Sequence, residues 1–331
     1  MSKKWWLVLA ASGVLAFGVA ACGDDDDDDG GGGGGNGDLS GTIRIDGSST
    51  VAPISEAVAE LFNEENPGVD VTVGTSGTGG GFEKFCAGET DISDASRQIE
   101  EDEVKACEGN GIAFEEVQVV NDALTVVVNP ENPVTCITVE QLASVWGPKS
   151  KLTNWGDIEG LDADFSEELA LYSPGSDSGT FDYFTDAING EEGVQRSANV
   201  NDVGEDDNAT VTGVGGAPGG MGYFGFSFFQ ENEDTLKALE VDGGQGCVAP
   251  SVETAQDGSY TPLARGLYLY PSAQALEKPE VLAFIQFYLD NANDVAEQVG
   301  FIPLTEEQLS ESQTKVDSLA GGGGGGTETT G

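Results

Sequence analysis

Hydrophobic and polar residues alternate with a period of two in several short segments of the chain. This pattern predicts β-strands, because successive side chains of a strand point to opposite faces of a sheet. The segments read "GTIRIDG" at 41–47, "VDVTVG" at 69–74, "ELALYS" at 168–173 and "GLYLYPS" at 266–272. The run "ALTVVVN" at 123–129 is apolar without alternation and predicts a strand that is buried on both faces.

Between these strands, apolar residues recur at intervals of three and four, as on one face of a helix. Helices are predicted at about 51–63, 79–88, 138–146, 181–188 and 279–300. The segment at 138–146 opens with Thr138 and Gln141 in the spacing of a capping box. Strands that alternate with helices indicate an α/β protein with largely parallel sheets. The length of 331 residues suffices for two ordinary domains.

The composition argues against several classes of function. Thirteen basic residues stand against 59 acidic ones, a formal net charge of −46, so we expect no nucleic acid as a partner. We interpret the acidity as a means of solubility. Histidine is absent, which excludes Ser–His–Asp and Cys–His catalytic arrangements. We expect no enzyme, no cofactor and no metal site; an enzyme that uses a metal held by carboxylates is the alternative.

The first residues have the pattern of an export signal. Lys3 and Lys4 precede an apolar run at 5–21, and the run closes with "VAAC" before the chain turns polar. We expect 1–21 to be a lipoprotein signal peptide and Cys22 to carry the lipid that holds the protein at the outer side of the cell membrane. A permanent transmembrane anchor is the alternative. Segments 22–40, rich in Asp and Gly, and 319–331, rich in Gly, are predicted to be disordered.

Four further cysteines indicate disulfides in an exported protein. Four cysteines allow three pairings. We favour Cys86–Cys107, which are close in sequence, and hence Cys136–Cys247.

Three loops rich in Gly, Ser and Thr each follow a predicted strand and precede a predicted helix. We call them the first loop (46–50, "DGSST"), the second loop (74–81, "GTSGTGGG") and the third loop (173–180, "SPGSDSGT"). The N-terminus of a helix exposes unpaired N–H groups and a partial positive charge, so each loop is suited to bind an anion without a lysine. Any one of them could instead be an ordinary helix cap; three of one kind favour a ligand.

Asp94 and Arg97 lie between the second and third loops, in "TDISDASRQ". An ionised aspartate only accepts hydrogen bonds, so it tolerates an anion that brings a proton, as hydrogen phosphate does and sulfate does not. Arg97 is expected to balance the charge with a forked contact. The alternative is a surface ion pair of little energetic value.

Several segments taken together resemble one family. "IDGSSTVAPI", "SGTGGGFEKFC", "DISDASR", "DSGTFDYF" and "GYFGFSFF", from about Thr42 to Leu304, are similar to the phosphate-binding proteins of bacterial phosphate ABC importers, the PstS family. The resemblance implies the type II periplasmic-binding-protein fold, in which two α/β lobes are joined by crossing strands and the ligand lies between them. By position in the family's motifs, the expected ligand-binding residues are Ser49, Thr50, Val51 through its backbone, Ser76, Asp94, Arg97, Ser178, Gly179 and Thr180. Some members carry an arginine just before the third loop, and this chain has none there, which leaves Arg97 as the expected cation.

We place lobe 1 at 41–122 plus 262–318 and lobe 2 at 123–261, with "VNDALTVVVN" and "TPLARGLYLY" crossing between them. "MGYFGFSFFQ" is predicted to be core of lobe 2. The expected function is that of a monomeric, lipid-anchored receptor that binds inorganic phosphate and delivers it to the permease subunits of an ABC importer. The alternatives are a phosphate-sensing or adhesive surface lipoprotein and a metal-assisted phosphohydrolase.

Overall fold

The structure, a computed structural model, describes residues 39–322. The expected signal peptide, the expected lipidation at Cys22, most of the tether and residues 323–331 lie outside this range. Residues 319–322 were expected to be disordered, and this boundary was wrong. They lie in helix α11 (Glu306–Gly322), where Leu319 and Ala320 pack against a hydrophobic cluster. Within 39–322, no helix combines the length and the apolar character that a membrane crossing requires.

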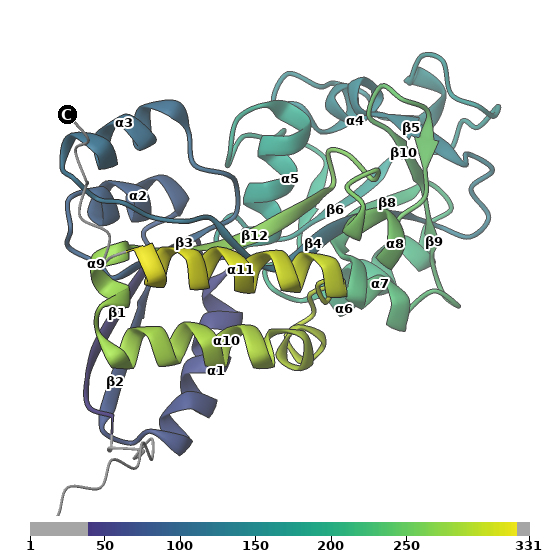
Figure 1. The fold of residues 1–331 in the computed structure, drawn as a ribbon. Coiled ribbons are helices and arrows are strands. Elements are labelled where there is room, and N and C mark those ends of the chain that lie inside the picture. The colour runs from purple at the N-terminus through teal and green to yellow at the C-terminus, as the bar shows by residue number, and fades with distance from the viewer. Residues whose placement is uncertain (1–38, 323–331) are drawn as a thin grey trace, which may run out of the picture. The chain divides into compact units, whose positions relative to one another are not determined.

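One nine-stranded sheet runs through the described chain (Figure 1). Its two outer parts are parallel, and its middle, where β12 pairs with β3 and β4 and where β4 pairs with β8, is antiparallel. A separate three-stranded sheet has the order β11-β10-β5. The large sheet has the order β2 (Val69–Gly74), β1 (Gly41–Gly47), β3 (Ile92–Ala95), β12 (Ala264–Pro271), β4 (Val117–Val128), β8 (Gly220–Gly225), β6 (Ala170–Ser173) and β7 (Val200–Asp202), with β9 (Lys237–Ala238) pairing with β4; the small sheet comprises β5 (Cys136–Thr138), β10 (Glu240–Asp242) and β11 (Cys247–Val248).

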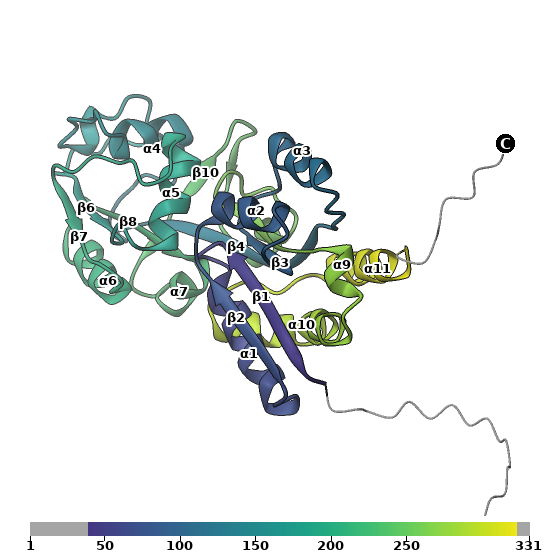
Figure 2. The ribbon, with the colours of Figure 1, turned by 90° about the vertical axis from the view of Figure 1, so that its left-hand side faces the viewer.

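Helices cover both faces of the part of the sheet that contains β1, β2 and β3. On one face α1 and α10 pack together, and on the other α2 and α3 form a smaller cluster around Phe82 and Phe85 (Figure 2). The helices in chain order are α1 (Ala52–Glu65), α2 (Thr78–Cys86), α3 (Glu101–Gly109), α4 (Val139–Trp146), α5 (Gly179–Asn189), α6 (Asp207–Gly216), α7 (Phe226–Glu231), α8 (Val252–Gln256), α9 (Ala273–Leu276), α10 (Pro279–Gln298) and α11, with a 3-10 turn at Trp155–Asp157.

Two large hydrophobic clusters divide the described chain. In β4, Val120 belongs to the first cluster and Ala123 to the second, and a similar change occurs between Leu263 and Leu267 at β12. Strands β4 and β12 therefore connect the two cores, as expected for crossing strands. Ile302 packs in the second cluster although it lies within 262–318. Our division into lobe 1 and lobe 2 is an interpretation of these two clusters.

Several elements follow from the sequence pattern. β1 alternates buried Ile43 and Ile45 with more exposed residues, and α4 begins with the predicted capping box, in which the Gln141 backbone N–H donates to Thr138 Oγ1 (3.1 Å). Helices α3, α6, α7, α8, α9 and α11 were not predicted. Of these, α7, α8 and α9 are short, and in α3, α6 and α11 the mean hydropathy or the amphipathic contrast is low, so the apolar period is weak.

The cysteine pairing is confirmed, because disulfides join Cys86 to Cys107 and Cys136 to Cys247. Each stabilises chiefly by restricting the unfolded chain. The aromatic segment 221–230 is core of the second cluster as predicted, since Tyr223 and Phe226 are buried there.

Candidate anion-binding site

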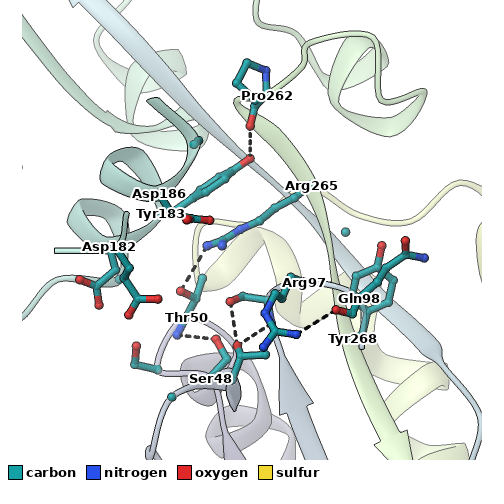
Figure 3. A pocket seen from close by; sticks show the side chains of 18 of the residues that line it. Ser48, Thr50, Arg97, Gln98, Asp182, Tyr183, Asp186, Pro262, Arg265 and Tyr268 are labelled. Carbon is teal, nitrogen blue, oxygen red and sulfur yellow. Dashed lines mark hydrogen bonds between the residues drawn. The ribbon is translucent and has the colours of Figure 1, made fainter. Parts of the chain in front are cut away.

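The N-termini of three helices face one cavity of about 500 Å³ (Figure 3). Ser49 and Thr50 precede α1, Gly77 precedes α2, Thr78 begins α2, and Gly179 begins α5; all five line the cavity. The first, second and third loops, which lie far apart in the sequence, are therefore brought together. This convergence is what a shared ligand requires.

The first turns of α2 and α5 keep their hydrogen-bonding capacity. Val51, Gly77 and Ser178 are the N-cap residues of α1, α2 and α5, and none of them makes a side-chain cap hydrogen bond. The first turn of α1 differs, because the Ala52 N–H donates to the Ser48 oxygen (3.1 Å) and Pro53 has no N–H. The unpaired N–H groups of α2 and α5 and the dipoles of all three helices favour a bound anion.

The third loop lies in contact with the first. A Cβ atom placed on Gly179 would lie 2.8 Å from Thr50 Oγ1 and 3.5 Å from Thr50 Cα. A side chain at Gly179 would separate the two loops, so glycine is required for this close approach. Ser178, which is buried, and Thr180, which is half-buried, flank Gly179 in the chain, but neither of them lines the cavity.

Asp94 lies beneath the first loop. Its backbone oxygen accepts a hydrogen bond from the Ser48 N–H (2.9 Å), and its side chain is fully buried, with both carboxyl oxygens free of hydrogen-bond partners among residues 39–322. Burial raises the pKa of Asp94 to about 7; the nearby Ser55 hydroxyl lowers it in part, and the Asp46 carboxylate raises it further. A buried carboxyl without a partner is costly. Asp94 does not itself line the cavity, whose wall at this point is formed by Ser48 and Ser49 of the first loop.

The structure places Ser76 differently from our expectation. Its backbone N–H and its hydroxyl both donate to Asp46 Oδ1, and its side chain is exposed instead of lining the cavity. Lys84 contacts the other oxygen of the same carboxylate. Thr78 lines the cavity instead. The second loop contains both hydroxyl residues, and its spacing gave no signal to decide which one faces inward.

Arg97 lines the cavity, but its forked contact is made with Glu103. Nη1 donates to Oε2 and Nη2 to Oε1, each at 2.8 Å, and Nε lies 3.5 Å from Glu100 Oε1. Hydrogen bonding to Glu103 raises the pKa of Arg97. The guanidinium that we expected to bind the ligand is therefore held by carboxylates of α3 and the residue before it.

Arg265, on β12, also lines the cavity and was missed in the sequence. Its Nε donates to Asp122 Oδ2 (3.2 Å), and its guanidinium carbon lies 3.5 Å from the centre of the Tyr183 ring. Its Nη2 donates to Thr50 Oγ1 at 3.3 Å, a hydrogen bond that can be followed in Figure 3. The segment 261–270 was predicted as a crossing strand, but nothing in its pattern places one of its side chains beside the first loop.

Carboxylates line the rest of the cavity, chiefly on the side of α5. Burial raises the pKa of Asp182, and the Glu192 carboxylate raises it further. The cavity therefore combines donors at three helix N-termini with a negative surrounding. The acidic residues that line it are Glu100, Asp182, Asp186 and Glu192.

Comparisons with known proteins agree with this geometry. A family described as "PBP superfamily domain" matches residues 34–292. Protein SphX of Synechococcus elongatus is 48% identical over 265 residues, which cover 79% of this chain and 77% of that protein. The phosphate-binding protein PstS of Staphylococcus saprophyticus is 37% identical over 325 residues, which cover 96% of each chain. The crystal structure of a possible phosphate binding protein from Planctomyces limnophilus is 41% identical, with a TM-score of 0.79 over 85% of this chain and 99% of that one.

Proposed function

Because the chain belongs to the PBP superfamily and, within it, to the family of phosphate-binding proteins of bacterial phosphate ABC importers, we propose that it binds inorganic phosphate outside the cytoplasm and delivers it to such an importer. Its fold is that of type II periplasmic binding proteins. The family consists of binding proteins and not of enzymes, so the site's task is to recognise phosphate and release it unchanged.

The observation that carries this proposal is the meeting of three helix N-termini beside a buried, unpartnered carboxyl group. The donors around Thr50, Thr78 and Gly179 offer a tetrahedral oxyanion hydrogen bonds from several directions. Asp94 offers an acceptor and no donor when it is ionised. While Asp94 is ionised, a ligand that fits must be anionic and must carry a proton of its own.

Hydrogen phosphate meets both requirements, whereas sulfate at neutral pH carries no proton. We propose that the phosphate hydroxyl donates to Asp94 and that the remaining oxygens accept from the three loops. Sulfate in the same place would leave the carboxylate facing an oxyanion without a hydrogen bond, which is repulsive. Asp94 would therefore select phosphate over sulfate, although the hydrogen-bond donors of the three loops are the same for both anions.

Ligand capture is proposed to involve both lobes. Thr50 and Thr78 belong to segments of lobe 1, and Ser178, Gly179 and Thr180 to a segment of lobe 2. A ligand that accepts hydrogen bonds from both favours the closed arrangement over an open one, because only the closed arrangement makes all these contacts. The backbone N–H of Val51 and the side chain of Ser49 complete the proposed set on the first loop.

Attachment and partners are part of the same proposal. The lipoprotein pattern that ends at Cys22 supports a monomeric receptor held at the membrane through a lipid. We propose that the permease subunits of a phosphate importer accept the ligand from it. A globomycin-sensitive shift in the mass of the exported chain would test the lipid attachment.

Calorimetric titration of the purified chain, freed of phosphate by dialysis, tests the binding function. We expect tight binding of phosphate and binding of sulfate that is weaker by at least about a hundredfold, since at least one charged hydrogen bond is replaced by repulsion. In Asp94→Asn, whose amide donates as well as accepts, this ratio should fall by about tenfold or more. Failure of the wild-type chain to bind phosphate would refute the function, and an unchanged ratio in the variant would refute the role of Asp94.

A further inference from the structure

A phosphate in this cavity would lie among carboxylates and needs a cation in contact with it. Glu100, Asp182, Asp186 and Glu192 line the same cavity, and removing a dianion from water beside such charges is costly unless it is paired. Helix dipoles each supply only about half a positive charge. Among the residues that line the cavity, two are cationic, Arg97 and Arg265.

Arg97 is already neutralised. Its fork is occupied by the two oxygens of Glu103, Nη1 also donates to the Gln98 oxygen (3.1 Å), and Glu100 approaches its Nε. To contact a ligand with both terminal nitrogens, Arg97 would have to break a bidentate ion pair and leave the Glu103 carboxylate, whose side chain is only 19% exposed, without its partner.

Arg265 is placed and available. Its side chain is 18% exposed. Two of its five N–H groups donate, one to Asp122 and one to Thr50, and the other three have no protein acceptor in the part of the chain that the structure describes. Because Thr50 Oγ1 accepts from Arg265, its hydroxyl proton remains free to point to a ligand. An anion bound to Thr50 would therefore lie beside the unused guanidinium donors.

The guanidinium is also held in a fixed orientation from three elements. Asp122 belongs to the crossing strand β4, Thr50 to the first loop, and Tyr183 to α5; the ring of Tyr183 stacks on the guanidinium, and its hydroxyl donates to the Pro262 oxygen (2.9 Å). A stacked and ion-paired arginine loses little further freedom when it binds an anion. Arg265 of β12 therefore contacts β4 through Asp122, the first loop through Thr50, and α5 through Tyr183.

We propose that Arg265, and not Arg97, is the cationic ligand-binding residue of this site, with Asp122 and Tyr183 as its positioning residues. The inference rests on the proposed binding of phosphate. The second crossing strand, β12, would thereby supply the positive charge for the ligand. The loops do not supply it, because the third loop has no arginine before it and Arg97 is paired with Glu103.

Titration with inorganic phosphate at fixed ionic strength tests this assignment in four proteins: wild type, Arg265→Gln, Arg97→Gln and Lys105→Gln. Lys105 is an exposed cation of α3, and its variant controls for the change in net charge. We expect Arg265→Gln to weaken phosphate binding by about ten- to a hundredfold, since contacts to a charged group are lost. Arg97→Gln and Lys105→Gln should stay within about threefold of wild type, because neither removes a contact to the ligand.

Each outcome decides between the alternatives. If wild type binds no phosphate, the proposed function fails, whatever the variants do. If wild type binds and Arg265→Gln stays within threefold, or Arg97→Gln loses as much as Arg265→Gln, then the assignment of Arg265 is wrong while the function stands.

A variant that simply unfolds would give no titration, so a second variant and readout are needed. Arg265→Lys keeps the charge and loses the fork and the flat stacking surface. It should retain more affinity than Arg265→Gln, and phosphate should still raise its melting temperature. A purely structural role for Arg265 predicts that both variants melt lower without ligand but gain the same stabilisation from saturating phosphate as wild type; that result would overturn the assignment.

Discussion

The two sides of the cavity are built differently. On the side of β1, β3 and α2, backbone hydrogen bonds tie the loops to the sheet: Ser48 N–H donates to Asp94 O and Gly77 N–H to Gly47 O, each at 2.9 Å. The third loop, before α5, is tied by backbone hydrogen bonds to the segment after β7: the Gly175 N–H donates to Gly204 O (2.9 Å) and the Val203 N–H donates to Ser173 O (3.0 Å). Among residues 39–322, it makes no hydrogen bond to the first or second loop.

This difference indicates separate tasks for the two sides. The first side holds its donors and the Asp94 acceptor in place before a ligand arrives, which lowers the entropy lost on binding. The second side touches the first mainly through the close approach of Gly179 to Thr50. We infer that the first side sets selectivity and that the second side adds affinity by closing over the ligand.

The largest effect is expected from a side chain placed between the two sides. In Gly179→Val, the added atoms would collide with Thr50, since the Cβ alone would lie 2.8 Å from Thr50 Oγ1. The donors of the third loop would then be kept from the ligand, and we expect calorimetry to show phosphate binding weakened by more than about a hundredfold.

Gly225→Val is the matched control for this change. Gly225 also stands at a helix N-terminus, has an ordinary negative φ of −60°, and has open space where a Cβ would lie. Its affinity for phosphate should match that of wild type. Equal affinity in Gly179→Val and Gly225→Val would contradict closure of the third loop over the ligand.

A smaller loss is expected when only the hydroxyl donors of the third loop are removed. Ser178→Ala with Thr180→Ala leaves the backbone N–H groups of α5 in place, so binding should weaken by about 1.5–3 kcal/mol, about ten- to a hundredfold. Because the first side is unchanged, the ratio of phosphate to sulfate affinity should stay within about threefold of the wild-type ratio. A collapse of that ratio would show that selectivity is shared between the sides.

The smallest effect concerns the first side without any ligand. The pKa of Asp94 is about 7 in the folded protein, above its ordinary value of 3.8, so between these values the folded state keeps a proton that the unfolded chain releases. The stability contributed by protonated Asp94 is fully present below about pH 4 and is lost as the pH rises through 7.

Asp94→Asn has no side chain that titrates at this position, so its stability does not fall as the pH rises through 7. Its melting temperature relative to wild type should therefore rise by a few degrees between pH 5 and pH 8, as measured by calorimetry without phosphate. Asp102→Asn, which changes a side chain that is 95% exposed, is the control and should show no such trend. A constant difference for Asp94→Asn would mean that Asp94 does not retain its proton in the folded state.

Much of this protein follows from local patterns. Period-two alternation located β1 and β2 at their observed bounds, and an apolar period of three to four located α1 and α10 within a few residues. Each pattern reports which side of one element is buried, and burial is a local requirement. The three loops were found in the same way, because glycine and hydroxyl residues between a strand and a helix mark a helix N-terminus.

Ser76 and Arg97 make other contacts in the structure than we expected, and the physical reason is the same for both. Ser76 and Thr78 stand two residues apart in a loop, and whether a hydroxyl turns to Asp46 or to the cavity depends on how β1 and α2 pack. In the same way, Arg97 and Arg265 are both arginines near a strand end, and only packing shows that the first meets Glu103 and the second Thr50.

The sequence by itself predicted the α/β architecture and the positions of the three loops, since hydrophobic period and glycine content act over short distances along the chain. It favoured, among three possible pairings, the disulfides that the structure shows, and the crossing strands were expected from the family resemblance. The tertiary structure alone decided which side chains share the cavity and which arginine contacts the first loop. Contacts between residues as distant as Thr50 and Arg265 arise when two cores form around the same pair of strands, and no short segment contains that information.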